Sequence, residues 1–594
     1  MRKLTRTGSL LSDFLPRVKN EDPRPVMCTS QTRLLDLLRS TGGLGSTTLR
    51  PVAAHSRFYP YQGERFPLLL LLINFVLAIL LGGCRAGPSS LQFPPDAMVL
   101  HLVTRDDVPT LDPVAGYDTA SWGFEQMLFD TLVRYSDSGV NLVPDAATKW
   151  ESSADARTFT FHLRPDIRFS NGRAVTSNDF KYEIERVLDP ANNSQGIEYY
   201  REIAGAEQYS NGRAKDVEGI ETPDRWRIIF HLTSPDPTFL AKLAMPFAAA
   251  VPRETIERYG RDFSRHVIGS GPFELKEWES GQRIVLVKNP YYFIKGVPYL
   301  DAVIEQMGVD DNLEWLKYES GEIDVSAIPP AEFPYVMKTP RLRALTLKLV
   351  TLATYYLGMN CQMPPFTDVR VRRAFNYAIN KDKLIAVFNR RGVAASGILP
   401  PGLPGYDPAV RGYPYDPAKA RQLLEQAAIP ANFRPQLWIR ADETQMMLAQ
   451  SIQQDLAAVG INILLKPVAW PPFLEAIRQL DTVELALSGW EADFPDPENF
   501  LEVLFARKQW GANNNSFYYN PQVDALFARA AVLTDMKQRY AMYDEAQKLI
   551  VSDAPWVFLY YPVSYVIRQP WVHGYRLNPL RPTRLERVWL EPHR

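Results

Sequence analysis

The sequence predicts an α/β fold in which helices cover a β-sheet. Helical patterns at 417–427 and 443–459 alternate with short apolar strand patterns at 436–440 and 462–467, and this alternation is typical of a helix-covered sheet. The composition, 46% hydrophobic and 22% charged, is that of an ordinary globular protein. A chain of 594 residues is long enough for about two to four domains.

The first 66 residues are rich in Ser, Thr and Arg and weakly patterned. They indicate either a disordered extension or a start codon assigned too early.

An uncharged apolar run follows at 67–83, preceded by Arg57 and Arg65 and ended by Leu81-Gly82-Gly83-Cys84. A basic flank, an apolar core and small residues before a cysteine resemble a bacterial lipobox, which predicts a lipidated Cys84 as the mature N-terminus. The alternative is an uncleaved transmembrane anchor, since about 17 residues is the short end of a membrane span. Both alternatives place the folded body outside the cytoplasmic membrane, with 85–95 as a tether.

Within the body, the most patterned segment predicts a strand at 158–163, a turn at Asn171-Gly172 and a helix over 177–188. Thr176 is the expected N-cap of that helix, with Asp179 completing a capping box. A strand pair at 220 and 226–232 is predicted to turn at Pro223-Asp224. Further helices are expected at 237–243, 313–319, 368–388, 521–533 and 536–552, and further strands at 354–360 and 556–561.

The stretch from Val483 to Phe500, VELALSGWEADFPDPENF, is the candidate functional segment. Its start reads as a buried strand that ends at Gly489-Trp490, and Pro495 and Pro497 predict a loop through Glu498. A tryptophan beside a carboxylate can grip an amine through an ion pair and the indole face. The alternative is a surface loop with solvated acids and a core tryptophan.

Other classes of function lack support. The sequence has no HExxH, GxSxG or phosphate-loop motif, and its three cysteines, Cys28, Cys84 and Cys361, have no zinc spacing. Residues 84–594 carry 55 basic and 62 acidic side chains, and this mildly acidic balance argues against nucleic-acid binding. We therefore expect a binding protein without cofactor or metal, and not an enzyme.

Seven motifs follow one another along the chain: RTFTFHLRPDIRFSNGRAVTSNDF, GSGPFELKEWESGQRIVLVKNPYYF, SGEIDV, TYYLGMNCQMPPFTDVRVRRAFNYAINKDKL, GWEADFPDPENF, NNNSFYYNPQVDAL and DAPWVFLYYPVSYVIRQPWVHGY. In this order they resemble the extracellular solute-binding proteins of ABC importers, family 5, the peptide/nickel-binding family, and most resemble its oligopeptide-binding members. The similarity spans about residues 100–576.

The resemblance implies a two-lobed periplasmic-binding-protein fold, class II-like and of cluster C, with an extra inserted domain and a ligand cleft between the lobes. Domain I would be discontinuous, at 96–141, 268–350 and 567–594. Domain II, at 142–267, would be inserted in it, and domain III, at 351–566, would form the opposite lobe. The lobes would close on the ligand about a hinge.

In peptide-binding relatives the aspartate of the Gly-Trp-x-x-Asp motif pairs with the α-ammonium of the ligand, and the resemblance implies that role for Asp493. Trp490 and Glu491 would lie beside it, and backbone groups around Tyr355–Asn360 and Ser488–Glu491 would pair with the peptide main chain. The predicted ligand contacts are Ser488, Gly489, Trp490, Glu491, Asp493, Tyr355, Tyr356 and Asn360. The alternative for Asp493 is that it caps its loop internally.

The sequence also departs from the family pattern, because Leu487 stands where oligopeptide binders carry a base for the ligand carboxylate. Peptide length differs, or another base such as Arg440 serves, or the C-terminus is not clamped. Glu491 adds a carboxylate that would favour a more cationic ligand.

The predicted function is a monomeric, membrane-anchored lipoprotein that captures peptides and delivers them to the permease and ATPase subunits of an ABC importer. The alternatives are a non-peptide solute (a sugar, metal chelate, haem or opine), a signalling receptor without transport, and a secreted hydrolase, which the missing nucleophile motifs disfavour.

Overall fold

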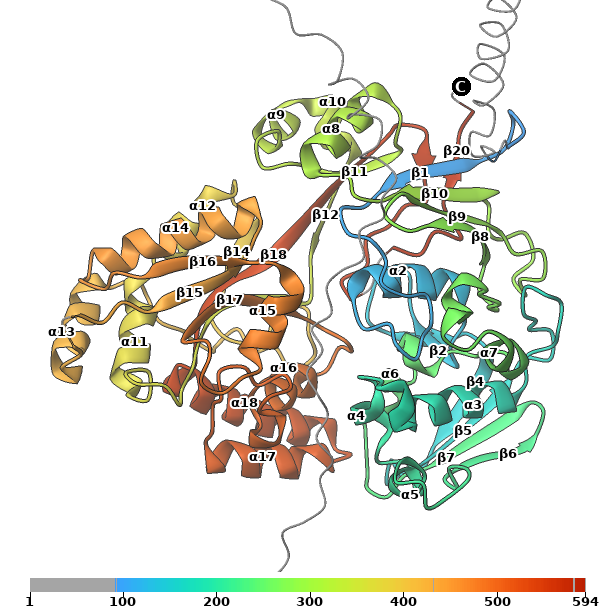
Figure 1. Ribbon diagram of the computed structural model, residues 1–594, viewed down its shortest axis with the longest axis horizontal. Coiled ribbons are helices and arrows are strands. Elements are labelled where there is room, and N and C mark those ends of the chain that lie inside the picture. The colour runs from blue at the N-terminus through green and yellow to red at the C-terminus, as the bar shows by residue number, and fades with distance from the viewer. Residues whose placement is uncertain (1–90, 92, 431, 581–582, 593–594) are drawn as a thin grey trace, which may run out of the picture. The chain divides into compact units, whose positions relative to one another are not determined.

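The computed structural model describes residues 91, 93–430, 432–580 and 583–592, and Gln92–Arg594 forms one compact unit (Figure 1). The predicted N-terminal extension, the apolar run with Cys84 and most of the tether lie outside the described residues. Within the described ranges, every helix is too short or too polar to cross a membrane.

A four-stranded sheet brings together segments far apart in the sequence. Its order is β1-β10-β9-β8; β1 is parallel to β10 and the other pairs are antiparallel. The strands are β1 (Val99–Val103), β8 (Phe273–Glu279), β9 (Arg283–Lys288) and β10 (Ala302–Gln306). One hydrophobic core joins this sheet to residues of the C-terminal pair β19 (Val572–His573) and β20 (Trp589–Leu590). Three segments of the chain therefore fold as one body.

A second sheet, of order β4-β5-β7-β6, lies wholly within 142–267. Its strands are β4 (Ala147–Ser152), β5 (Thr158–Leu163), β6 (Ile220–Asp224) and β7 (Arg227–His231), and a separate small pair is β2 (Val133–Tyr135) with β3 (Leu142–Pro144). Phe159, Phe161 and Leu163 are buried at alternate positions of β5, as strand geometry requires. The helix over Ser177–Leu188 begins with the predicted capping box of Thr176 and Asp179.

The turn predicted at Pro223-Asp224 is wrong, because both residues belong to β6 and the chain turns at Arg225-Trp226. The Asp224 carboxylate accepts a hydrogen bond from the N–H of Trp226, an Asx-type contact that places the turn two residues further along the chain.

The largest sheet has eight strands. Its main order is β11-β18-β13-β17-β15-β16, and β12 and β14 also pair with β18. The strands are β11 (Val325–Ala327), β12 (Thr346–Val350), β13 (Ala353–Met359), β14 (Gly392–Ala394), β15 (Gln436–Arg440), β16 (Leu464–Val468), β17 (Leu485–Glu491) and β18 (Trp556–Arg568). β18, the long red strand of Figure 1, continues past the predicted domain boundary at 566 and past the expected strand end at Tyr561. The domain boundaries themselves stay predictions.

Helices cover both faces of this sheet, as the α/β prediction required (Figure 1). Residues of α11–α14 pack with Leu357, Leu485 and Leu487 on one face, and residues of α16–α18 pack with Tyr356 and Trp556 on the other. The helices are α2 (Thr119–Leu128), α3 (Ser177–Leu188), α4 (Ile197–Tyr200), α5 (Ala206–Ser210), α6 (Phe239–Lys242), α7 (Arg253–Tyr259), α8 (Asp311–Ser320), α9 (Phe333–Lys338), α10 (Pro340–Leu345), α11 (Val369–Ala378), α12 (Lys381–Val387), α13 (Pro417–Ala427), α14 (Glu443–Ala457), α15 (Trp470–Ile477), α16 (Pro497–Phe505), α17 (Pro521–Ala531) and α18 (Met536–Asp553).

Candidate ligand-binding site

Asp493 lies two residues beyond β17 and is 8% exposed. Three donors converge on its Oδ2: Tyr117 Oη at 3.0 Å, Tyr199 Oη at 2.9 Å and Asn499 Nδ2 at 3.0 Å. A buried carboxylate requires such donors, because the charged form is costly to remove from water. Asp493 is therefore held in one orientation by groups from three separate parts of the chain.

Asn499 orients this loop from the first turn of α16. Its Oδ1 accepts the backbone N–H of Asp493 at 2.9 Å and the indole N–H of Trp490 at 3.1 Å, and the Asn499 side chain is fully buried. The loop predicted through Glu498 is too long: α16 begins at Pro497, with Asp496 as its N-cap. Proline suits the first helical position, where its missing N–H is not needed.

Tyr117 precedes α2 and Tyr199 lies in α4, and their hydroxyls are 2.9 Å apart. Burial raises the pKa of Tyr199 well above its ordinary value, and the negative charge of Asp493 raises it further. Tyr199 therefore stays a hydrogen-bond donor. Aromatic rings surround this pair, since Phe247 contacts both tyrosines and Phe494 meets Tyr199 edge-on.

The backbone of β17 offers an unpaired edge near Asp493. Hydrogen bonds from Ala492 N to Leu352 O and from Asn360 N to Glu484 O fix the phase of the antiparallel β13–β17 ladder. Because bonded and non-bonded pairs alternate in such a ladder, the N–H and C=O groups of Gly489 and Glu491 point away from β13. On that side β15 pairs only with Leu485 and Ala486, so in the described chain no strand covers the edge at Gly489 and Glu491.

The predicted main-chain role of Tyr355–Asn360 is wrong. β13 is an interior strand, paired with β17 on one edge and with β18 on the other, so its backbone groups already have partners. This strand cannot also pair with a peptide. The prediction for Ser488–Glu491 is compatible with the structure only at the outward-facing groups of Gly489 and Glu491.

The side chains predicted at the site divide between the two faces of the sheet. Tyr355 lies opposite Gly489, where a Cβ would come within 3.0 Å of the Tyr355 ring, and it stacks on Tyr560 with ring centroids 5.0 Å apart. Tyr356, Ser488 and Asn360 point to the opposite face, where they line a small cavity. The period of two along a strand separates them.

Asn360 and Trp490 have structural partners of their own. The Asn360 side chain is buried and donates to the carbonyls of Leu480 and Val483, which fixes the turn before β17. Trp490 packs on the core and its N–H is bound by Asn499. Whether any predicted side chain touches a ligand stays a prediction, and the structure assigns these two a role in shaping the site.

Charged groups gather near the open edge. Glu491 is the last residue of β17 and is exposed to solvent. Surrounding protein atoms nevertheless desolvate its carboxylate, and this desolvation, together with the charge of Asp493, raises its pKa. Burial raises the pKa of Tyr355, and the charge of Glu491 adds to the effect while Arg440 opposes it. Arg440 Nη2 lies 3.4 Å from Asp106 Oδ1, across the predicted lobes.

The sequence missed Tyr117, Tyr199 and Asn499. Asn499 had a local signal, because it is a polar residue at the third position of a helix that begins with proline. Nothing near the tyrosines points to Asp493. In the part of the chain that the structure describes, no three His, Cys, Asp or Glu side chains are placed to hold a metal ion.

Comparison with known proteins identifies the family. The profile of the bacterial extracellular solute-binding proteins, family 5 Middle, matches residues 141–512. The chain belongs to this family. The family 5 protein is thus a solute-binding protein and not an enzyme, as the sequence predicted. Membership of an extracellular family agrees with a folded body outside the cytoplasm.

Two curated relatives and one solved structure show the range of this family. The family 5 protein is 28% identical to heme-binding protein A of Haemophilus influenzae over 76% of this chain and 85% of that protein. It is 28% identical to the dipeptide-binding protein of Escherichia coli over 78% and 89%. The structure of the ABC transporter-associated periplasmic binding protein DppA from Helicobacter pylori, in complex with peptide STSA, matches with a TM-score of 0.73 and 29% identity over 83% and 98%. The two-lobed fold is confirmed.

Proposed function

We propose that this protein is the substrate-binding lipoprotein of an ABC importer and that it captures peptides, holding the α-ammonium group on Asp493. The importer's permease and ATPase subunits would be its partners, and lipid on Cys84 would anchor it to the membrane. The dipeptide-binding relative and the peptide complex of the Helicobacter pylori protein support the ligand class.

The observation that carries the proposal is a buried carboxylate at the end of a strand with an open edge. An ammonium group at Asp493 would replace neutral donors by a charged one, which is a stronger hydrogen-bond partner. The next peptide units would then run along Gly489 and Glu491 and add a strand to β17. Main-chain pairing of this kind does not discriminate between side chains, which suits a transporter of varied peptides.

The peptide carboxylate needs a different partner from the one expected in the family. Leu487 is 3% exposed and packs in the core under α11–α14, so this position cannot serve a ligand. Arg440 is the cation that we assign to the role, because its charge acts on Tyr355, whose ring lies beside Gly489. Binding would then require the Arg440–Asp106 ion pair to open or to share the guanidinium.

Native mass spectrometry of the purified protein tests the proposal. A spread of bound masses that fragment into short peptides is expected, and Asp493→Ala should lose it. A single non-peptide mass would overturn the peptide assignment, and a porphyrin mass would favour the chemistry in the name of the Haemophilus influenzae relative. For the anchor, Cys84→Ser should release the protein from membranes, and continued membrane retention would point to an uncleaved span.

A further inference from the structure

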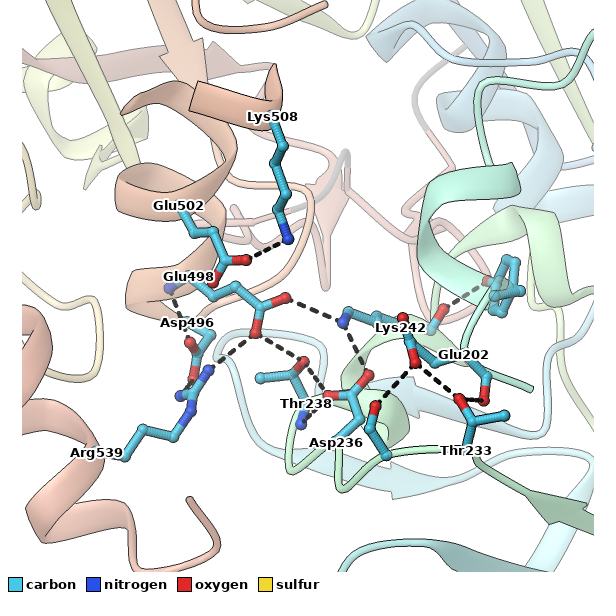
Figure 2. A network of polar contacts seen from close by, with 12 residues as sticks. Glu202, Thr233, Asp236, Thr238, Lys242, Asp496, Glu498, Glu502, Lys508 and Arg539 are labelled. Atoms are coloured by element: carbon cyan, nitrogen blue, oxygen red, sulfur yellow. Dashed lines mark hydrogen bonds and ion pairs between the residues drawn. The ribbon is translucent and has the colours of Figure 1, made fainter. Parts of the chain in front are cut away.

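A cluster of buried charges connects residues 236–242 with α16 and α18. Lys242 Nζ lies 2.8 Å from Asp236 Oδ2 and 3.0 Å from Glu498 Oε1. Thr238 Oγ1 lies 2.6 Å from Asp236 Oδ1 and 3.2 Å from Glu498 Oε2. Arg539, which is fully buried, binds Glu498 at 2.9 Å. We call these five residues the Glu498 cluster. Figure 2 shows Lys242, Thr238 and Arg539 meeting at the Glu498 carboxylate, with Asp236 joined to it through Lys242 and Thr238.

The cluster adjoins the ligand site through a single helical turn. Glu498 and Asn499 are consecutive in the first turn of α16. Glu498 reaches Lys242, whereas Asn499 holds Asp493. Lys242 also lies 5.7 Å from the ring of Phe494, the residue after Asp493. A displacement of this turn therefore moves the Asp493 loop as well.

The residues of the Glu498 cluster come from both predicted domains II and III. Asp236, Thr238 and Lys242 come from 142–267, whereas Glu498 and Arg539 come from 351–566. If the lobes part, Lys242 keeps Asp236 and Glu498 keeps Arg539, so no charge is stranded. Within the cluster, closure adds the contacts of Glu498 with Lys242 and Thr238.

An ionic contact of this kind suits a joint that must open again. A buried ion pair contributes little net stability because desolvation offsets attraction, yet losing one partner is strongly unfavourable. An apolar contact of the same size would hold the lobes together more tightly. The cluster therefore specifies a precise closed geometry without making closure irreversible.

We propose that Lys242 is a positioning residue of the ligand site: through Glu498 it seats domain II against the first turn of α16 and so couples lobe closure to the placement of Asp493. The role rests on the proposed function only in that Asp493 is taken as the ligand anchor. Lys242 acts on affinity through the closed population and touches no ligand.

The test compares Lys242→Met with Lys242→Arg, which keeps the charge, and with Lys508→Met. Lys508, in the short 3-10 turn at 507–509, pairs with Glu502 of the preceding helix α16 at 2.7 Å (Figure 2), so its loss leaves the contact between domains intact. Thr238→Val is a milder second variant. Thermal unfolding first establishes that each variant is folded.

Spin labels on the full-length protein, at exposed Lys215→Cys in domain II and Lys537→Cys in domain III, report the distance between the domains. The distance between the two labels is measured in the protein alone and after addition of a tryptic digest of casein. Lys242→Met is expected to lower the closed-to-open ratio at least tenfold and to weaken binding of the digest by the same factor, since apparent affinity scales with the competent fraction. Lys242→Arg and Lys508→Met should resemble the wild type. Thr238→Val should shift the ratio in the same direction but less.

The proposal is overturned if Lys242→Met and Thr238→Val both leave the distance distribution unchanged. Asp493→Ala separates the two proposals, because it should abolish the shift caused by the digest. Its shift is measured against its own ligand-free distribution, since the variant also lacks the contacts of Asp493 with Tyr117 and Tyr199. If Asp493→Ala binds the digest normally while Lys242→Met still opens the lobes, the ammonium assignment fails and the positioning of the two domains by Lys242 stands.

Discussion

Replacing Asn499 by alanine tests whether its side chain fixes the ligand anchor. The substitution removes three hydrogen bonds. It leaves the N–H groups of Asp493 and Trp490 without an acceptor in a buried site, at about 1–3 kcal/mol each, and it removes a donor to the Asp493 carboxylate that contributes about 1.5–3 kcal/mol. Allowing for relaxation of the loop, we expect the free energy of peptide binding to weaken by on the order of 3 kcal/mol. This is equivalent to a little more than a hundredfold increase in Kd.

Isothermal titration calorimetry with a peptide recovered by native mass spectrometry measures the effect. Asn376→Ala is the matched control, because Asn376 is equally buried and donates to the carbonyl of Trp556, outside the Asp493 loop. It should lower the melting temperature without a comparable loss of affinity. The reasoning is refuted if Asn499→Ala binds peptide within threefold of the wild type, or if both variants lose affinity equally.

Three further predictions concern charge. Burial raises the pKa of Glu183 to about 8, against an ordinary 4.5. Between pH 4.5 and 8 the folded state keeps a proton on this carboxyl that the unfolded chain has lost. The free energy of unfolding therefore falls as the pH rises from 4.5 to 8. Glu183→Gln should therefore stabilise the protein more at pH 7.5 than at pH 5, by up to about 3 kcal/mol in urea unfolding, and an equal effect at both pH values would contradict the shift. Glu491→Gln should weaken binding of Lys- and Arg-rich peptides more than of neutral peptides in calorimetry, and equal weakening would remove the cationic preference. Arg539→Met leaves Asp496 and Glu498 as buried carboxylates without their guanidinium partner, so it should cost about 3–5 kcal/mol, seen as a lower melting temperature; an unchanged melting temperature would show that the site relaxes or takes up protons.

Elements with strong local signals were predicted with accurate bounds. β5 over 158–163, α3 over 177–188, α13 over 417–427 and β15 over 436–440 agree with the sequence patterns residue for residue. Each has an alternating or helical period bounded by a cap or turn residue, so nearby residues alone determine its ends.

Elements whose ends depend on tertiary pairing were predicted less well. β18 extends past its expected end at Tyr561, although Pro562 cannot donate a hydrogen bond within a ladder. The strand continues because Pro562 is needed there only as an acceptor, from the N–H of Thr351. β17 likewise extends through Glu491, where pairing with Ala353 continues.

The candidate site was predictable only in part. Asp493 and its neighbours were found because the motif is continuous in the sequence. Tyr117 and Tyr199 are hundreds of residues from Asp493, and only the packing of α2 and α4 brings them there. The division of Tyr355 and Tyr356 between two faces follows from the strand period, but which face meets the site depends on how the whole sheet is covered.

The 13 residues of β18 have a mechanical consequence. Residues 563–568 pair with β11 and β12, whereas 556–562 pair with β13 and β14. Any rotation between those two groups of strands must be taken up as a change of twist within the continuous backbone of β18. Pro562, at the junction, contributes no N–H to either group, and its ring fixes its own φ, so the residues on either side of it must take up the twist.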